Sequence, residues 1–247
     1  MQEKQKTSLY AQLCSKERKK IAVLVDPDKH NEKTLLKLIE TSSKSNTDFF
    51  LVGGSLLLTP IEKTISLIKK NTDVPLLLFP GNLLQLSDKV DGILLLSLIS
   101  GRNPELLIGN HVLAAPLIKS SGIETIPTGY LLISTGKKTS VEYISNTTAI
   151  PAEKTDIAVA TSIAGELLGQ KLIYLDAGSG AENPVPSGMI EQVKKNIDIP
   201  LIVGGGLKNA SQIRNACKCG ADIIVVGNSL EKSSNSISAF ADIVHGF

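Results

Sequence analysis

The segment KLIYLDAGSGA, residues 171–181, decides the fold of this chain. Its first part, 171–175, is an apolar run of strand length bounded by polar residues, which predicts a buried strand. The glycines that follow permit sharp turns and a close approach to a ligand, and Asp176 places a carboxylate at the end of the strand. A strand ending in a glycine loop is equally typical of a plain turn into a helix, so this segment alone does not define a site.

Two later apolar runs end in the same way. Residues 201–203 lead into three glycines at 204–206, and residues 223–226 lead into the sequence GNS at 227–229. Three strands with small-residue exits near the end of a chain of this length are typical of a (β/α)8 barrel. In that fold, the loops after the last two strands offer backbone N–H groups to a phosphate.

Length and composition agree with one (β/α)8 barrel that spans residues 1–247 as a single domain. The chain has 247 residues, of which 42% are hydrophobic and 20% charged, and its formal net charge is +2. This small charge argues against a nucleic-acid partner held by electrostatics. The three cysteines favour a reducing compartment, so we expect a cytoplasmic protein. No apolar run reaches the ~18 residues that a membrane span requires.

Apolar runs alternate with helical patterns along the chain, which predicts a parallel barrel. A first helix, capped by Thr7 or Ser8, is expected to extend to about Lys19, and a short helix is expected over 83–90. Pro127 and Gly129 predict a bent or bulged fifth strand. The polar segment 137–155 is expected to cover the barrel mouth or to form an insertion, and 156–170 is expected to be a helix rather than a ninth strand. The eight strands are expected at 21–25, 49–52, 75–79, 92–96, 124–132 and 171–175, and from about 199 and 222.

Five short motifs occur together over most of the chain: VDPDK at 25–29, VGGS at 52–55, the segment 174–181 followed by PVP at 184–186, VGGG at 203–206, and VGNS at 226–229. In these motifs the chain resembles the geranylgeranylglyceryl phosphate synthases and the related heptaprenylglyceryl phosphate synthases, specifically their longer branch. These are (β/α)8 prenyltransferases. The resemblance implies magnesium-dependent transfer of a polyprenyl group, geranylgeranyl by this likeness, from its diphosphate to the free primary hydroxyl of sn-glycerol 1-phosphate. It also implies a homo-oligomer. A lipid substrate of this kind would be reached through transient contact with a membrane surface or taken from solution.

The resemblance also implies roles for single residues. It makes Asp26 and Ser55 the magnesium ligands, and Asp176 the catalytic residue that orients the glycerol hydroxyl and can accept its proton. Where this chain has Asp176 the family usually has glutamate, so the carboxylate is retracted by one methylene. The phosphate and glycerol site would consist of Tyr174, Asp176, Ala177, Gly178, Ser179, Gly180, Gly205, Gly206, Gly227 and Asn228.

The residues themselves leave other interpretations open. Asp26 precedes a proline and is also typical of a turn, and Tyr174 is also typical of a core aromatic. Asp26 and Asp176 would equally serve as the acid and base of a phosphate-binding barrel isomerase or lyase, because the fold alone does not fix the reaction. A third possibility is a non-catalytic sensor of a phosphate ligand. Apolar residues near the mouth, such as Leu56 and Leu132, would line a prenyl groove or belong to the core.

Overall fold

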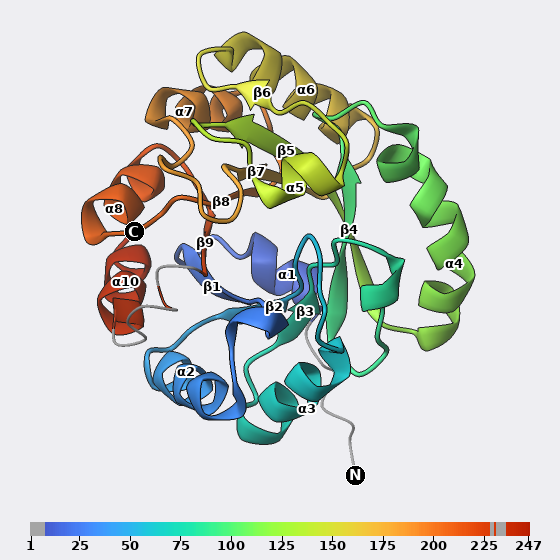
Figure 1. Ribbon diagram of the computed structural model, residues 1–247. Helices are drawn as coiled ribbons and strands as arrows, with labels where there is room; N and C mark the ends of the chain where they lie inside the picture. The colour runs from blue at the N-terminus through green and yellow to red at the C-terminus, as the bar shows by residue number, and fades with distance from the viewer. Residues whose placement is uncertain (1–7, 228–229, 231–235) are drawn as a thin grey trace.

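The computed structural model describes residues 8–227, 230 and 236–247, and eight of its strands close a parallel barrel surrounded by helices (Figure 1). The sheet order is β4-β3-β2-β1-β9-β8-β7-β5-β6, and an additional pairing of β4 with β5 closes the barrel. The predicted (β/α)8 fold is therefore confirmed. The barrel strands are β1 (Lys20–Val25), β2 (Phe49–Val52), β3 (Leu76–Leu78), β4 (Gly92–Leu98), β5 (Glu124–Ser134), β7 (Leu172–Asp176), β8 (Leu201–Gly204) and β9 (Ile223–Val226).

Helices connect the strands on the outside of the barrel, as parallel pairing requires. None of the helices in the described part of the chain has the length and hydrophobicity needed to cross a bilayer. The α-helices are α1 (Leu9–Cys14), α2 (Glu32–Lys44), α3 (Ile61–Asn71), α4 (Asn110–Ser121), α5 (Ser140–Ile144), α6 (Thr155–Leu167), α7 (Ser187–Lys195), α8 (Ala210–Lys218) and α10 (Ser236–His245). Shorter turns are η1 (Pro27–Lys29), η2 (Leu83–Gln85) and the π-helical segment η3 (Glu105–Gly109).

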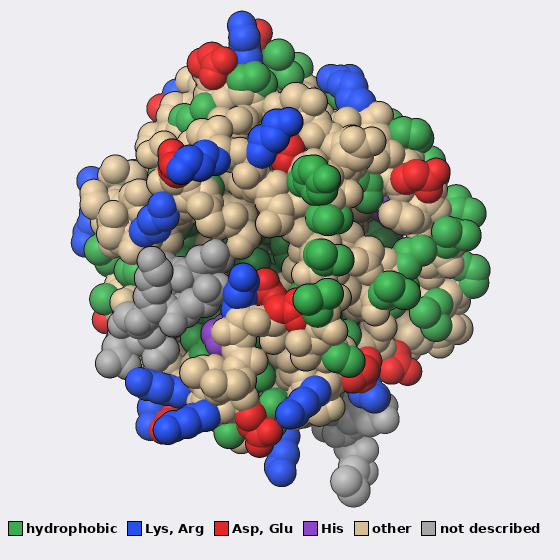
Figure 2. Space-filling model, in the orientation of Figure 1, with side chains coloured by type: hydrophobic (Ala, Val, Ile, Leu, Met, Phe, Trp, Pro, Cys, Tyr) green, Lys and Arg blue, Asp and Glu red, His purple; other side chains and the backbone are tan. Residues whose placement is uncertain are grey.

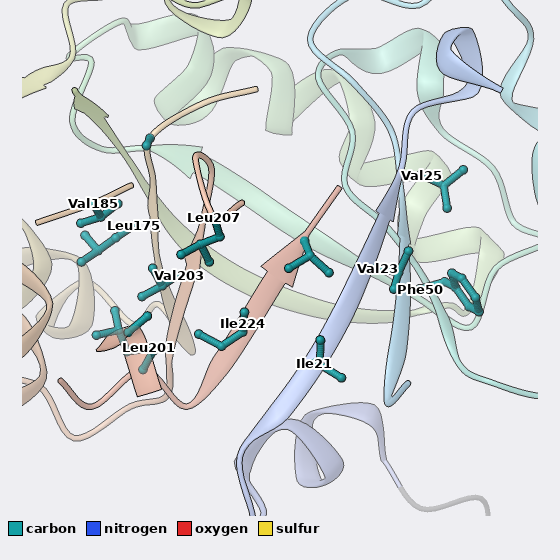
Figure 3. Close-up of a cluster of buried hydrophobic side chains, with 14 of the residues drawn as sticks. Ile21, Val23, Val25, Phe50, Leu175, Val185, Leu201, Val203, Leu207 and Ile224 are labelled. Carbon is teal, nitrogen blue, oxygen red and sulfur yellow. The ribbon is translucent and has the colours of Figure 1, made fainter. Parts of the chain in front are cut away.

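The alternation of side chains along each strand divides the apolar residues into two cores. On β1, Ile21, Val23 and Val25 point outward and pack with the surrounding helices in an outer core, part of which is shown in Figure 3. Ala22 on the same strand belongs to an inner core that fills the barrel. Tyr174 and Asp176 share this inward direction on β7, because they are two residues apart. Because side chains alternate in direction along a strand, the Asp176 side chain points into the barrel interior.

Helix α1 closes the barrel at the N-terminal ends of the strands and lies behind the barrel in Figure 1. Leu9 and Leu13 of α1 belong to the inner core. The Glu124 carboxylate accepts hydrogen bonds from the backbone N–H groups of Leu9 and Tyr10, at 2.7 and 2.8 Å. Ser8 caps this helix through its side chain, as one of the two alternatives predicted, while Thr7 lies outside the described residues. The helix ends at Cys14, so the prediction that it reaches Lys19 was wrong.

One other local prediction was wrong, and one of the two alternatives predicted for the fifth strand is excluded. The helix expected over 83–90 is only the single turn η2, Leu83–Gln85. The fifth strand has no bulge, because its pairing with β4 advances one residue at a time from Gly92↔Glu124 to Leu98↔Tyr130. A Cβ at Gly129 would lie 2.9 Å from Ile99 and 3.0 Å from Ile173, so the glycine makes room for packing rather than for a bulge.

The segment 137–155 is neither plain loop nor separate domain. It contains α5 and the two-residue strand β6 (Ile150–Pro151), which pairs with the end of β5. Lys138, Thr139 and Val141 line the cavity described below, so the segment covers the barrel mouth as expected. Residues 155–167 form α6, which confirms the helix preferred over a ninth barrel strand.

Candidate functional site

A cavity of about 930 Å³ opens at the carboxyl ends of the barrel strands. Parallel closure brings the ends of all eight strands to this face, so residues distant in sequence meet there. The cavity contains nearly all the described residues predicted for the site. Those that line it are Asp26, Ser55, Tyr174, Asp176, Gly178, Ser179, Gly180, Gly205, Gly206 and Gly227. Ala177 is buried beside it, and Asn228 lies outside the described residues.

Asp176 is the buried carboxylate at the polar end of the cavity. Its Oδ1 accepts a hydrogen bond from the Gly178 backbone N–H at 2.8 Å, and its Oδ2 accepts one from the Tyr130 hydroxyl at 2.5 Å. Burial raises the pKa of Asp176, and these two hydrogen bonds oppose the rise. Each carboxylate oxygen can accept a second hydrogen bond, so Asp176 is held in place and can still accept one from a ligand hydroxyl.

Two consecutive glycines after β8 approach the loop after β7 more closely than any other residue type could, Gly205 at Asp176 and Gly206 at Asn183. Gly205 and Gly206 have φ of +73° and +68°, in the left-handed region that favours glycine. A Cβ at Gly205 would lie 2.4 Å from Asp176 Oδ1 and 2.6 Å from the Gly178 nitrogen. The loops after β7 and β8 therefore fit against each other through backbone atoms.

Tyr174 belongs to the inner core, as one interpretation predicted, and it also borders the cavity. Its ring packs against Phe79 and Tyr130, each with a centroid distance of 5.4 Å. A Cβ at Gly204 would lie 2.4 Å from its hydroxyl, so the ring fills the space above that glycine. Burial raises the pKa of Tyr174 well above its ordinary value and keeps the phenol neutral.

Asp26 lies on the opposite side of the cavity, at the end of β1. Its Oδ1 accepts a hydrogen bond from the Asp28 backbone N–H at 3.0 Å, so it caps η1 as a turn carboxylate would. Its Oδ2 accepts no hydrogen bond within the described part of the chain. A Cβ at Gly54 would lie 3.6 Å from that oxygen, so the loop that carries Ser55 runs beside it. Burial raises the pKa of Asp26, and the nearby Lys29 charge opposes the rise.

The loop after β2 is fastened at two points that were not predicted. Asp28 accepts hydrogen bonds from the backbone N–H groups of Leu58 and Thr59, both at 2.8 Å. The buried Gln85 side chain donates to the Gly54 carbonyl at 2.6 Å and accepts from the Gly54 and Gly81 N–H groups. These contacts hold the backbone next to Ser55 in one conformation.

The other half of the cavity is largely apolar, although Asn103, Glu105, Asn110 and His111 also line it. It extends from the polar end toward β4, α4 and α5, where its walls include Leu96, Leu106, Ala114, Ile118 and Val141. Leu131 and Leu132 belong to the buried core and are not among the cavity-lining residues, whereas Leu56 borders the cavity. Three lysines also border it, namely Lys29, Lys138 and Lys208. The cavity therefore combines a polar, glycine-lined end with a largely apolar groove.

Sequence reasoning missed three residues of this site: Tyr130, Gln85 and Thr139. Tyr130 lies within a long apolar strand and Gln85 within a helical pattern, so neither carried a local signal. Thr139 packs on Gly178, where a Cβ would lie 2.7 Å from its methyl group. Its hydroxyl is buried and has no hydrogen-bond partner among the described residues, which makes it a candidate ligand contact.

The fold and the cavity define a (β/α)8 protein with one site that joins a glycine-lined polar end to a largely apolar groove. The sequence matches the PcrB family over residues 14–244, so the chain belongs to that family. It is 49% identical to the geranylgeranylglyceryl phosphate synthase of Chitinophaga pinensis, with 92% of this chain and 90% of that protein aligned. The corresponding protein of Spirosoma linguale is 48% identical, with 93% of each chain aligned.

A solved structure agrees with these sequence relatives. The (S)-3-O-geranylgeranylglyceryl phosphate synthase of Thermoplasma acidophilum, in complex with its substrate sn-glycerol-1-phosphate, matches with a TM-score of 0.92 and 30% identity. The match covers 97% of this chain and 99% of that one. The resemblance inferred from the five motifs is therefore confirmed.

Proposed function

We propose that this protein is a prenyltransferase that joins a polyprenyl group, from its diphosphate, to the primary hydroxyl of sn-glycerol 1-phosphate. The relatives that match over nine-tenths of the chain are geranylgeranylglyceryl phosphate synthases, and one of them binds sn-glycerol-1-phosphate. The observation that carries the proposal is that one cavity has both a glycine-lined polar end and a largely apolar groove. An isomerase or lyase acting on a small phosphate would need no such groove.

The polar and apolar ends of the cavity suggest how the substrates would be oriented in it. The phosphate of sn-glycerol 1-phosphate would lie against the backbone of Gly205, Gly206 and Gly227, which line the cavity, because N–H groups of glycine loops bind such anions, whereas the Gly178 N–H already donates to Asp176. Its free hydroxyl would then reach Asp176, and the polyprenyl chain would occupy the groove toward α4. Apolar walls favour such a chain by about 25 cal/mol for each Å² that is removed from water.

The reaction forms one C–O bond and breaks another. The glycerol hydroxyl oxygen attacks the first carbon of the prenyl group, while the bond from that carbon to the diphosphate oxygen breaks and diphosphate leaves. Asp176 orients the hydroxyl and can accept its proton, and the raised pKa of this carboxylate makes it a better base. Asp176 is one methylene shorter than glutamate, and its bonds to Tyr130 and Gly178 hold it at the end of β7. A substrate hydroxyl must therefore come close to the barrel interior.

Asp26 and Ser55 are proposed to hold Mg²⁺. In the described residues no three His, Cys, Asp or Glu side chains converge on one point, so a site closed by protein ligands is absent from that part of the chain. Magnesium commonly binds through one or two carboxylates, water and substrate phosphates, and the unpartnered Asp26 Oδ2 beside the Ser55 loop fits such an open site. When bound, the ion would neutralise charge on the departing diphosphate.

The proposal is tested with purified protein, labelled sn-glycerol 1-phosphate, Mg²⁺ and a series of polyprenyl diphosphates of increasing length. A lipid-soluble ether product is expected from the wild type, with strong loss in Asp26→Ala. Binding of sn-glycerol 1-phosphate without any product, at every chain length, would refute the transferase and favour the sensor. Magnesium-independent product formation would refute the metal assignment alone.

A homo-oligomer is proposed from the outward face of α4. Ile108, Val112, Leu113 and Leu117 are all exposed on this helix or the preceding turn, and hydrophobic side chains gather along this edge in Figure 2. A second copy of the chain would cover them, because patches of this kind are uncommon on monomers. Light scattering should give a multiple of the chain mass of 26.3 kDa, and Leu113→Asp should reduce it.

The three cysteines are free in the structure, in keeping with the cytoplasmic location that we also propose.

A further inference from the structure

Large hydrophobic side chains surround the cavity opening and point into solvent. Leu58, in the loop after β2, is 85% exposed, and Leu84, in η2 after β3, is 93% exposed. On α5, after β5, Tyr143 is 81% exposed and Ile144 45%. We call these residues, together with the exposed Leu56, the mouth rim. Figure 2 shows hydrophobic side chains in a line across this face, near α5.

The mouth rim is held by specific contacts, so its exposure is built into the fold. Asp28 accepts the Leu58 N–H at 2.8 Å, which places this side chain at the turn of the loop. Gln85, the neighbour of Leu84, is buried and bonded to Gly54, which turns Leu84 away from the core. Leucine is usually buried and glutamine usually exposed, but here Gln85 is buried and the neighbouring Leu84 is almost fully exposed.

We propose that the mouth rim docks this protein on the surface of a lipid bilayer. The proposal rests on the proposed function, because a polyprenyl diphosphate and its ether product both partition into membranes. The apolar half of the cavity continues into the rim, since Leu56, Tyr143 and Ile144 belong to both. A prenyl chain can therefore pass from bilayer to groove along apolar surface without crossing water, which would cost free energy for each exposed CH₂ group.

Hydrophobic contact, rather than charge, is the driving force that the rim supports. Most cationic residues near it have anionic neighbours: Lys137 pairs with Glu182 at 2.9 Å, Lys208 lies near the same Glu182, and the cavity edge carries Asp28 as well as Lys29, while Lys138 has no ion pair among the described residues. A polybasic surface would make binding depend on anionic lipid. The exposed leucines and Tyr143 instead predict insertion into a neutral interface, since leucine and aromatic side chains favour the boundary between headgroups and acyl chains.

The test is flotation of the full-length protein with vesicles of pure phosphatidylcholine. The double variant Leu58→Asp, Leu84→Asp removes two rim side chains that do not line the cavity. It should lower the vesicle partition coefficient by about tenfold or more, because two apolar contacts are replaced by charges. The matched control is Leu167→Asp, Leu168→Asp, at the end of α6 on the opposite face, where the two leucines are 82% and 81% exposed. This control should bind vesicles like the wild type.

A second measurement separates this proposal from the proposed function. With a short, water-soluble allylic diphosphate and no vesicles, the rim variant should turn over at the wild-type rate, whereas with a long substrate in vesicles it should be slower. No flotation of the wild type, equal loss in the control, or binding that requires added phosphatidylglycerol would each overturn docking through the rim. If no variant has any transferase activity, the proposed function fails, while the flotation result still decides the docking.

Discussion

Substitution of Tyr130 by phenylalanine tests whether its hydroxyl governs the candidate catalytic carboxylate. The Tyr130 hydroxyl donates to Asp176 Oδ2 at 2.5 Å, and both residues are buried. Tyr130→Phe keeps the ring that packs on Phe79 and Tyr174, at centroid distances of 5.8 and 5.4 Å, and removes only the donor. The fold should therefore survive, and the change should be confined to the protonation and orientation of Asp176.

The expected magnitude follows from the strength of that one bond. A hydrogen bond to a charged group contributes about 1.5–3 kcal/mol. If this stabilises the working geometry of Asp176, its loss lowers kcat/KM roughly 10- to 150-fold, at about 1.4 kcal/mol for each factor of ten. The bond from Tyr130 holds the pKa of Asp176 down against the effect of burial, so its removal raises that pKa further. Because the carboxylate is the active form, activity should then be lost at a higher pH than in the wild type as the pH falls.

The assay is kcat/KM for ether formation, measured from acid to neutral pH for both proteins. Tyr10→Phe is the control, because it removes the same hydroxyl group from α1 at the opposite end of the barrel. It should leave rate and pH profile unchanged. If Tyr130→Phe has the wild-type rate and the same acid limb, Asp176 does not depend on this hydrogen bond and the reasoning is refuted. A lower rate at every pH with an unmoved acid limb would assign Tyr130 to positioning alone.

Three other substitutions test the rest of the site. Gly205→Ala should destroy affinity for sn-glycerol 1-phosphate in calorimetry and cost about 1–3 kcal/mol of stability, because its Cβ would lie 2.4 Å from Asp176 and its φ is left-handed. Gln85→Ala should lower the free energy of unfolding by about 1–3 kcal/mol in denaturant titrations, because the Gly54 carbonyl loses its buried donor. Asp26→Asn should raise the Mg²⁺ concentration for half-maximal activity at least ~10-fold in a metal titration, because a ligand loses its charge.

Each of these has a control or a contradicting result. Gly188→Ala, in α7, meets no atom within 4 Å and should leave both affinity and stability intact. Gln192→Ala, on the exposed face of the same helix, should not change the free energy of unfolding. Tight binding by the Gly205 variant would show that the glycine loop is not the anion site. An unchanged metal requirement in the Asp26 variant would remove that residue from the magnesium site.

The barrel could be predicted because the sequence pattern of its strand and helix units is repeated along the chain. Each apolar run followed by a small-residue exit is weak alone, but parallel closure requires the same unit eight times, and the runs at 171–175, 201–203 and 223–226 supplied the most distinctive copies. Single departures from the pattern were harder. The residues after Leu83 have helical spacing, yet the chain leaves the helix after one turn because Gln85 is buried against the loop at Gly54.

Pro127 and Gly129 show why local rules misjudged the fifth strand. Proline lacks an N–H group, but pairing of β5 with β7 begins only at Thr128↔Leu172, so Pro127 lies just before that ladder. Gly129 is explained by side chains from outside its own strand, Ile99 and Ile173, which occupy the space of a Cβ. Both explanations depend on neighbours that are distant in sequence, and no window around residue 128 contains them.

The same distinction separates the site residues that were predicted from those that were missed. The glycines at 205 and 206 were visible because backbone contact with a ligand needs a particular residue type in sequence. Tyr130 was invisible because its role comes from a partner 46 positions away, and a tyrosine in an apolar strand is ordinary. The proposed anion-binding loops depend on backbone conformation, which the glycines in the sequence indicate. The position and pKa of the Asp176 carboxylate depend instead on a side-chain contact across the barrel, which is seen only in the folded structure.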